Sequence, residues 1–471
     1  MNEFASEVID ADGNIHYLQP KPLGQGGQGV VLRTRSPHIA VKLIGAMPFG
    51  VPNQVPDPQK QAALRRRIED VRTLPLSRLN VAQPLSMLRD HVGYTMRLLN
   101  GMVPMRSLIA ELGDKKVGPF YQQTGGLDRR LKLLANTATL LARLHSVPLV
   151  YADISPNNVF ISEATYASEV WLIDLDNLDY QSPNAPSICT PSFGAPEVVT
   201  GRASVTTLSD CYSFAVLAFY VLAQVHPFLG DYVENGDWGD ADDVDREQLA
   251  FQGDVSWVED PDDNSNWTDN GIPRHLVLSA PVRNLFERTF GAGRKDRTKR
   301  PSMAEWADVL SRAVDRIVSC KNCGSTFDVA ATNCPFCASS PRPSFIHMQV
   351  NRWEPELDET EASAVSTRAV WHKMIDATPD SVTEIHRHVL EPIVTDSENP
   401  PVLRIGVMRS GITIEQLNGH EINVALNGRL VKVTGKTKLP IPKQGNEAYL
   451  HFGKLNQPHR MAVLRYYESE A

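Results

Sequence analysis

Residues 151–160 read Tyr-Ala-Asp-Ile-Ser-Pro-Asn-Asn-Val-Phe, and residues 171–176 read Trp-Leu-Ile-Asp-Leu-Asp. The first stretch contains the pattern D-x-x-x-x-N from Asp153 to Asn158, and the second is an apolar run that leads into Asp174. An Asp carboxylate and an Asn carbonyl oxygen suit Mg²⁺, which is small, hard and octahedral. In phosphoryl transfer from ATP, this spacing supplies one carboxylate to the incoming hydroxyl and two oxygen ligands to the metal. The two stretches therefore predict a phosphoryl-transfer site, provided that the rest of the chain supports it.

A glycine-rich stretch precedes these residues, in which Gly24, Gly26 and Gly29 form the pattern G-x-G-x-x-G. Dinucleotide-binding folds use the same spacing, but their glycines open a helix. Here the strand-like runs 30–33 and 38–42 follow instead. We therefore predict a glycine loop that joins two antiparallel strands, covers the phosphates of a nucleotide and donates backbone N–H groups to them.

The second of these strands carries Lys42, whose ammonium can lie against the phosphates. A lysine in this position must be oriented, usually by a carboxylate from a neighbouring helix. Between residues 43 and 75 the one helix-compatible stretch is 61–72, and it contains Glu69. We predict that Glu69 pairs with Lys42.

Together, these motifs resemble the eukaryotic-like protein kinase family over residues 18–312. The resemblance implies an α+β, bilobal fold, with a lobe of β-sheet plus one helix over about residues 1–98 and a helical lobe over about 99–315. It also implies ATP and Mg²⁺ as cofactors, a protein substrate, and a domain that ends near residue 315.

The resemblance implies roles for single residues as well. Asp153 corresponds to the catalytic-loop Asp, Asn158 to the second-metal Asn and Asp174 to the Asp of the D-F-G element. Glu197, in Ala-Pro-Glu at 195–197, closes the activation segment and pairs with Arg300. Asp210 braces the catalytic loop, Thr190 hydrogen-bonds to the catalytic Asp, and Met96 is the gatekeeper before the hinge at 97–101. The residues implied at the nucleotide are Gly24, Gly26, Gly29, Val31, Ala40, Lys42 and Met96.

Three positions depart from the family's pattern. The usual His-Arg before the catalytic Asp is Tyr151-Ala152, which argues against switching by a phosphate bound to that Arg. The usual Lys two residues after the Asp is Ser155, which removes a charge that steadies phosphate. The Gly of D-F-G is Asp176, whose carboxylate either binds a metal or stiffens a loop that glycine would leave free.

Thr190 favours serine/threonine specificity, because tyrosine kinases place other residues there. Candidate autophosphorylation sites in the activation segment are Ser182, Ser187, Thr190 and Ser192, which can equally be ordinary loop hydroxyls. Three alternatives stay open. They are a catalytically weak pseudokinase, a binding scaffold for which ATP is an occupancy switch, and a small-molecule phosphotransferase, which the full activation segment disfavours.

Four cysteines form two C-x-x-C pairs separated by ten residues, namely Cys320, Cys323, Cys334 and Cys337. Four thiolates can complete the tetrahedral shell of a structural zinc ion, so we predict a zinc ribbon over residues 316–340. A redox-active dithiol is the alternative. Cys189 and Cys211 remain as ordinary thiols.

Residues 341–471 change character, with short β-rich runs separated by turn signals such as Asn418-Gly419 and Asn427-Gly428. Asn-Gly between alternating apolar runs predicts hairpins, so we expect an all-β sandwich or barrel. The chain of 471 residues has 47 Lys and Arg against 55 Asp and Glu, a net charge of −8, which disfavours nucleic acid as a partner. The longest apolar run, 214–225, is too short to span a membrane. We expect a cytoplasmic protein.

The order of kinase domain, zinc ribbon and β-rich module resembles that of bacterial kinases associated with tellurite-resistance-type operons. The Asp-Leu-Asp-Asn sequence at residues 174–177 supports this resemblance. It implies a PP2C-type phosphatase and a von Willebrand A domain protein as substrates or partners.

Overall fold

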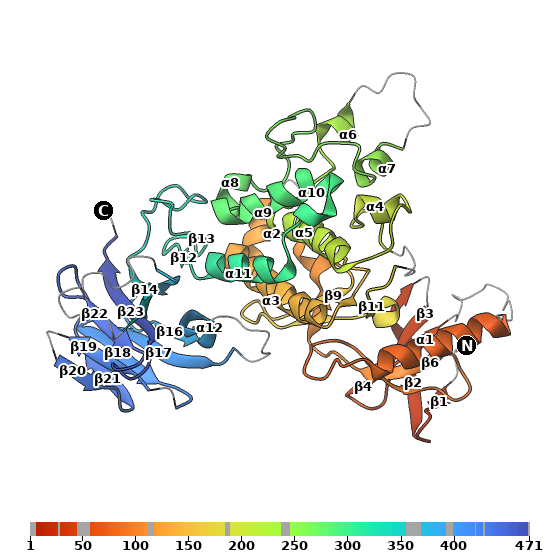
Figure 1. Ribbon diagram of the computed structural model, residues 1–471, viewed down its shortest axis with the longest axis horizontal. Helices are drawn as coiled ribbons and strands as arrows, with labels where there is room; N and C mark the ends of the chain where they lie inside the picture. The colour runs from red at the N-terminus through yellow and green to blue at the C-terminus, as the bar shows by residue number, and fades with distance from the viewer. Residues whose placement is uncertain are drawn as a thin grey trace.

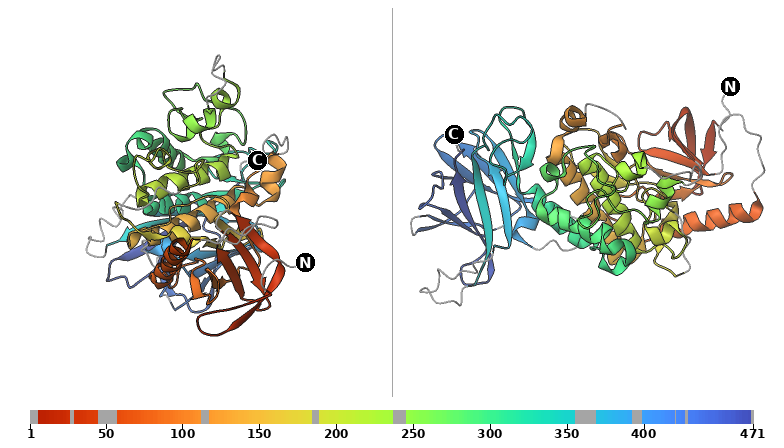
Figure 2. Two further views of the ribbon diagram at one scale, coloured as in Figure 1. Left: turned by 90° about the vertical axis from the view of Figure 1, so that its right-hand side faces the viewer. Right: turned by 90° about the horizontal axis from the view of Figure 1, so that it is seen from above.

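The computed structural model describes residues 6–26, 29–44, 57–111, 117–183, 189–236, 245–354, 369–391, 399–419, 421–426 and 429–469. The N-terminal sheet and the C-terminal sheets lie at opposite ends of the molecule, and most of the helices lie between them, whereas α1 (Pro58–Thr73) lies beside the N-terminal sheet (Figures 1 and 2). The arrangement agrees with the predicted bilobal fold, followed by an all-β part. No helix among the described residues is long and apolar enough to cross a membrane.

The first lobe is one antiparallel sheet with the strand order β1-β2-β3-β4-β6-β5. Its strands are β1 (Glu7–Ile9), β2 (Ile15–Gly26), β3 (Gly29–Thr34), β4 (Ile39–Ile44), β5 (Pro84–Met87) and β6 (Gly93–Arg97). The single long helix of this lobe is α1 (Pro58–Thr73), which begins where the Asp57 carboxylate accepts a hydrogen bond from the N–H of Gln59. Val30, Leu32, Val41 and Leu43 alternate along β3 and β4 and form the core of this lobe.

The second lobe is mainly helical and surrounds α5 (Thr207–Ala223). This helix contains most of the apolar run 214–225, and nearly all of its residues are buried. A capping box between Thr206 and Ser209 closes its N-terminus. The other helices are α2 (Val117–Gln123), α3 (Gly126–Ser146), α4 (Pro196–Val199), α6 (Asp231–Asn235), α7 (Arg246–Phe251), α8 (Arg274–Val277), α9 (Ala280–Phe290), α10 (Ala292–Lys295) and α11 (Met303–Val314).

In the described part of the chain, five short strands flank the loops that lie between the two lobes. They form a three-stranded sheet in the order β10-β9-β7 and a two-stranded sheet of β11 and β8. Their bounds are β7 (Met102–Pro104), β8 (Leu149–Val150), β9 (Val159–Ser162), β10 (Val170–Leu172) and β11 (Asp179–Tyr180). The loop from β8 to β9 and the segment after β10 hold the motifs on which the sequence analysis depends.

The C-terminal part contains two sheets that share one apolar core, which makes it a sandwich. One sheet has the order β15-β14-β23-β22-β19-β20 and the other has the order β16-β17-β18-β21. A single helical turn, α12 (Arg387–Leu390), interrupts it. The strands are β14 (Phe345–Trp353), β15 (Trp371–Asp376), β16 (Val382–His386), β17 (Pro401–Met408), β18 (Gly411–Gln416), β19 (Asn423–Leu426), β20 (Arg429–Lys432), β21 (Lys436–Leu439), β22 (Ala448–His451) and β23 (His459–Tyr467).

One predicted hairpin turn has a different role. Asn418 and Gly419 have the positive φ values of 53° and 74° that the turn requires. They connect β18 to β19, however, and these strands belong to different sheets. The turn therefore crosses the sandwich, and the prediction of a hairpin there was wrong. Asn427 and Gly428 lie outside the described residues, between β19 and β20, which do pair antiparallel.

Between the helical lobe and the sandwich lies a two-stranded unit of β12 (Ile317–Ser319) and β13 (Thr326–Asp328). It contacts the helical lobe at the start of α3, where the Thr326 hydroxyl accepts a hydrogen bond of 3.1 Å from the N–H of Asp128. It contacts the sandwich through Lys321, whose ammonium lies 2.9 Å from the Asp376 carboxylate.

Asp315, directly after α11, joins the helical lobe to the sandwich. Its buried carboxylate accepts hydrogen bonds of 2.7 Å from Trp371 Nε1 and 2.6 Å from Lys373 Nζ. The Nε2 of His388, on α12, lies 3.1 Å away from the same carboxylate. Burial alone would raise the pKa of Asp315, but the charge of Lys373 and the hydrogen bond and charge of His388 outweigh burial and hold the pKa well below its usual range.

We expect Asp315→Asn to lower the free energy of unfolding by about 2 kcal/mol at pH 7, because the charge-assisted bond from Lys373 is lost. The folded carboxyl group has the lower pKa, so its stabilisation is complete above the unfolded pKa of about 4 and is lost as the pH falls below that value. Urea unfolding at pH 7 and at lower pH should show a difference between wild type and variant that shrinks with acidification. Asp308→Asn, in an exposed pair with Arg312, is the control. A difference that does not depend on pH would contradict this assignment.

Candidate active site

One face of the N-terminal sheet carries the residues predicted at the nucleotide. Val31 pairs directly with both Gly24 and Lys42 on the neighbouring strands, and Ala40 pairs with Met96. Directly paired residues of an antiparallel sheet point to the same face, as do residues two apart on one strand. The side chains of Val31, Ala40, Lys42 and Met96 therefore share the face opposite to the core of this lobe.

The glycine hairpin joins β2 to β3, with Gly26 paired to Gly29. A Cβ atom at Gly29 would lie 2.1 Å from the carbonyl oxygen of Leu43. Glycine is therefore required for β3 to lie this close to β4. Residues 27 and 28, at the tip of the loop, lie outside the described residues.

The Lys42 side chain extends from this face and contacts two carboxylates. Its Nζ is 2.6 Å from Asp174 Oδ1 and 2.6 Å from Asp176 Oδ2. Burial alone would lower the pKa of Lys42, but the charges of Asp176 and Asp174 outweigh burial and raise it. The ammonium is therefore held in its charged form. Burial, together with Asp176 and Asp153, outweighs the attraction of Lys42 and raises the pKa of Asp174.

The structure corrects the prediction that Glu69 pairs with Lys42. Glu69 is on the solvent side of α1, where its carboxylate lies 2.9 Å from Arg72 Nε and 2.5 Å from Arg72 Nη2. The side of α1 that faces the site presents Arg67, whose Nε donates a hydrogen bond to the backbone oxygen of Asp176. Two residues along an α-helix correspond to a rotation of about 200°, so Glu69 points away when Arg67 points inward.

Asp153 and Asn158 are joined inside the loop between β8 and β9. The Asn158 amide Nδ2 donates to the Asp153 backbone oxygen at 3.0 Å and to Asp153 Oδ2 at 2.9 Å. Thr190, from the activation segment, donates to Asp153 Oδ1 through its N–H at 3.1 Å and its hydroxyl at 2.7 Å. The backbone N–H of Ile173 donates to the Asn158 backbone oxygen at 3.0 Å, which places Asp174 beside this loop.

Asp210, on α5, holds the start of the same loop. Its carboxylate accepts hydrogen bonds from the backbone N–H groups of Tyr151 at 2.8 Å and Ala152 at 3.0 Å. Ala152 has a positive φ of 73°, so the two N–H groups turn toward one carboxylate. The Tyr151 hydroxyl donates to the backbone oxygen of Ile173. Tyr151 therefore connects the loop that holds Asp153 to the residue before Asp174.

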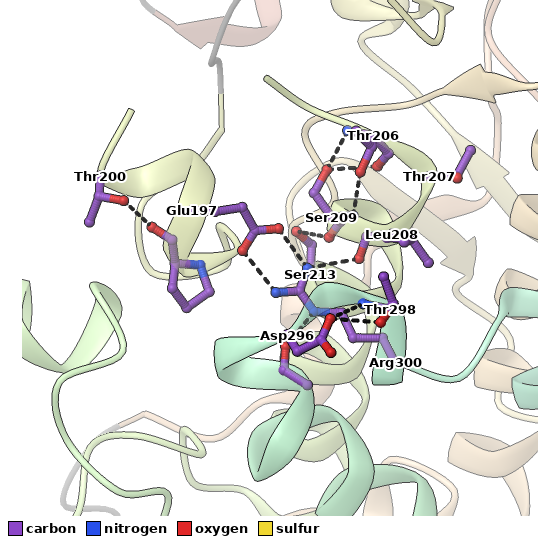
Figure 3. A network of polar contacts seen from close by, with 12 residues as sticks. Glu197, Thr200, Thr206, Thr207, Leu208, Ser209, Ser213, Asp296, Thr298 and Arg300 are labelled. Carbon is purple, nitrogen blue, oxygen red and sulfur yellow. Dashed lines mark hydrogen bonds and ion pairs between the residues drawn. The ribbon is translucent and has the colours of Figure 1, made fainter. Parts of the chain in front are cut away.

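Glu197 and Arg300 form a bidentate ion pair at the end of the activation segment (Figure 3). The two nitrogen–oxygen distances are 2.7 and 2.8 Å. The Arg300 side chain is fully buried and also donates to the backbone oxygens of Gly293 and Leu208. Its guanidinium lies over the Tyr212 ring, 4.9 Å from the ring centroid.

The remaining hydroxyls of the activation segment differ in their surroundings. Ser182 and Ser192 are half-buried, and Ser187 lies outside the described residues. The Thr190 hydroxyl donates its hydrogen bond to Asp153, so in this structure it fixes the loop that holds Asp153.

The four predicted cysteines come together. Their Sγ atoms lie within 4.8 Å of one another, at 3.8 Å between Cys320 and Cys337 and 3.6 Å between Cys323 and Cys334. Four thiolates about 2.3 Å from a tetrahedral zinc ion would be separated by about 3.8 Å. All four are free thiols. The cluster therefore fits a zinc ion in both donor type and spacing.

Three further residues belong to the site although no motif predicted them there, namely Tyr94, Arg67 and Tyr151. The Tyr94 hydroxyl donates to Asp176 Oδ1 at 2.9 Å. Tyr151 and Asp176 differ from the residues that the family's motifs have at these positions. Such a difference indicates a changed contact, so the sequence contained a signal for both. No local pattern marks Arg67 or Tyr94.

Comparisons with known proteins agree with this geometry. The chain is 31% identical over 330 residues to the serine/threonine-protein kinase pkn2 of Myxococcus xanthus, which covers 66% of this chain and 33% of that protein. It is 26% identical over 236 residues to the CBL-interacting protein kinase 22 of Oryza sativa subsp. japonica, covering 45% of this chain and 49% of that one. A 99-residue part is 34% identical to the human ribosomal protein S6 kinase alpha-3, covering 21% of this chain and 13% of that one.

The chain spans about a third of the length of the Myxococcus relative. Residues 17–309 match the protein kinase domain family, which is more than half of the chain. This range includes the glycine hairpin, Lys42, the loop of Asp153 and Asn158, Asp174 and the Glu197–Arg300 pair. From the match and the geometry together, we conclude that this chain belongs to the protein kinase domain family.

Proposed function

We propose that this chain transfers the γ-phosphoryl group of ATP to serine or threonine hydroxyls of a protein substrate. One observation carries the proposal, namely that Asp174 is next to both Lys42 and the loop of Asn158. Its carboxylate contacts the Lys42 ammonium, and the residue before it, Ile173, donates its backbone N–H to the Asn158 backbone oxygen. Residues from the sheet, the loop after β8 and the segment after β10 thus meet at one point. These are the groups that phosphoryl transfer needs, since its catalysis rests on positioning and electrostatic stabilisation.

Asp153 is proposed to orient the substrate hydroxyl and to accept its proton as the bond to phosphorus forms. Each carboxylate oxygen can accept two hydrogen bonds. Asp153 Oδ1 already accepts two hydrogen bonds from Thr190, and Oδ2 accepts one from Asn158, so the carboxylate is held in place with one acceptor site left, on Oδ2. The hydroxyl of Thr190 in this position also supports serine/threonine specificity.

Asn158 and Asp174 are proposed to hold Mg²⁺. The Asn158 side chain bonds to Asp153 through its nitrogen rather than through Oδ1, and Asp174 contacts Lys42 through Oδ1 rather than through Oδ2. An amide oxygen and a carboxylate oxygen are suitable ligands for this ion. When bound, Mg²⁺ neutralises charge on the phosphates of ATP.

The test is transfer of label from γ-labelled ATP to a generic acceptor or to the protein itself. We expect Asp153→Ala to lower the rate by about 100-fold or more, because general acid–base groups contribute at least that factor. The control is Asp179→Asn, an exposed carboxylate that accepts from the N–H of its neighbour Tyr180. Wild-type transfer no faster than that of Asp153→Ala would favour the pseudokinase scaffold instead.

Mapping of labelled positions by mass spectrometry would test the proposed autophosphorylation at activation-segment hydroxyls. We further propose a kinase domain over residues 1–315, a zinc ribbon over 316–340 and a β-rich module over 341–471. The resemblance in domain order suggests a PP2C-type phosphatase and a von Willebrand A domain protein as the first substrates to test.

A further inference from the structure

The group that positions Lys42 is a second question within this site. Asp174 and Asp176 both contact the ammonium, at 2.6 Å each. The proposed function assigns Asp174 to Mg²⁺, and a carboxylate that ligates a cation is a weaker partner for a neighbouring ammonium. The proposed function assigns no metal to Asp176. It is also the less exposed of the two, at 14% of its side chain against 32% for Asp174.

Two contacts besides Lys42 hold Asp176 in place, and a third holds its neighbour Asn177. Its Oδ1 accepts a hydrogen bond of 2.9 Å from the hydroxyl of Tyr94. Tyr94 is 1% exposed and is the residue that pairs directly with Lys42 across β4 and β6. The backbone oxygen of Asp176 accepts from Arg67 Nε, and the next side chain, Asn177, accepts from Arg67 Nη2 at 3.2 Å. One carboxylate oxygen therefore faces Lys42 while the other is fixed by the sheet.

The side of α1 that faces the site presents a positive side chain, whereas the Lys42 ammonium needs a negative partner. Its inward side presents Arg67, whereas Glu69 forms an exposed pair with Arg72. An inward arginine cannot neutralise Lys42, but it can hold a backbone carbonyl of the segment that does. The link from helix to lysine therefore runs through residues 176 and 177.

We propose that Asp176 is the positioning residue of Lys42, in place of a helix carboxylate, and that α1 acts on the site through Arg67. The proposal rests on the proposed function and deepens it. Glycine at position 176 would remove both the ion pair with Lys42 and the hydrogen bond from Tyr94. Asp176, which stands where the family has Gly, thus supplies the carboxylate that α1 does not direct toward Lys42.

The experiment compares Asp176→Asn and Asp176→Gly with Glu69→Gln and the control Asp179→Asn. KM for ATP and kcat are measured in the transfer assay, and Kd for Mg·ATP is measured by calorimetry. We expect both Asp176 variants to raise KM and Kd about tenfold or more, because the loss of one charge-assisted contact of 1.4 kcal/mol is a factor of ten. Glu69→Gln and Asp179→Asn should stay within about twofold of wild type.

A double-mutant cycle separates positioning from a structural role. On a Lys42→Met background, Asp176→Asn should have no further effect on Kd, whereas a merely structural residue would add its full effect. Full additivity, an unchanged Kd in Asp176→Asn, or an equal loss in Glu69→Gln would each overturn the proposal. If the wild type binds Mg·ATP but does not transfer phosphate, the proposed function fails while the binding cycle still tests Asp176. If the wild type does not bind Mg·ATP, both proposals fail.

Discussion

Removal of metal from the four-cysteine cluster is expected to unfold residues 316–340 and to loosen the contacts on both sides of them. The two strands of this unit have only three residues each, and its core consists of a few side chains such as Val318 and Phe327. So small a unit lacks the buried apolar area to fold alone. Structural zinc in comparable units contributes about 10–16 kcal/mol of apparent binding free energy, which is folding free energy.

The measurement is zinc content by mass spectrometry, together with thermal unfolding before and after treatment with a chelator. We expect one zinc ion per chain and a lower melting temperature after its removal. Cys334→Ser should reproduce the effect, because Cys334 is fully buried in the cluster. Cys189→Ser, outside the cluster, should retain the zinc. Absence of zinc, with reversible disulfide formation between the C-x-x-C pairs, would favour the redox alternative.

Arg300→Met is expected to lower the free energy of unfolding by about 3–5 kcal/mol, because it leaves the Glu197 carboxylate, whose side chain is only 18% exposed, without its partner. Glu197 would lose both hydrogen bonds, and the backbone oxygens of Gly293 and Leu208 would lose theirs. Burial alone would raise the pKa of Glu197, but the hydrogen bond and charge of Arg300 outweigh it and lower the pKa. Arg300→Lys should recover little of this stability, since an ammonium cannot form the two parallel hydrogen bonds that the guanidinium donates to the Glu197 carboxylate.

The matched control is Arg288→Met, which breaks an ion pair with Glu305 in which each side chain is 40% exposed. Exposed pairs contribute about 0–1 kcal/mol, so this variant should remain close to wild type. Urea unfolding of both variants at pH 7 gives the comparison. Equal losses in the two variants would show that the buried pair is not an anchor of the activation segment.

Much of the site was predictable from the sequence because its signals are local or depend on order along the chain. Asp153 and Asn158 are five residues apart in one loop, and their mutual hydrogen bond follows from that closeness. Strand alternation places Ala40 and Lys42 on one face. Each C-x-x-C pair lies in a turn, the first between β12 and β13 and the second after β13, and the short spacing within each turn keeps its two sulfur atoms close together.

Other features depend on contacts that no local pattern encodes. Lys42 and Asp176 are 134 residues apart, and no local pattern links them. Whether Arg67 or Glu69 points toward the site depends on which side of α1 faces the sheet. A rotation of that helix by about 200° would exchange Arg67 for Glu69, and helical periodicity alone does not set this rotation. The turn at Asn418 likewise has its expected backbone, yet the packing of two sheets determines where it leads.

Motif identity and spacing were thus sufficient for the family, the close approach of the four cysteines and the β-rich character of the C-terminal part. The partner of Lys42, the role of Tyr151 and the joint at Asp315 became visible only in the folded chain. The physical reason is the same in each case. Short-range geometry depends on covalent spacing, whereas the pairing of distant charges depends on how helices and sheets are rotated against one another when apolar surface is buried.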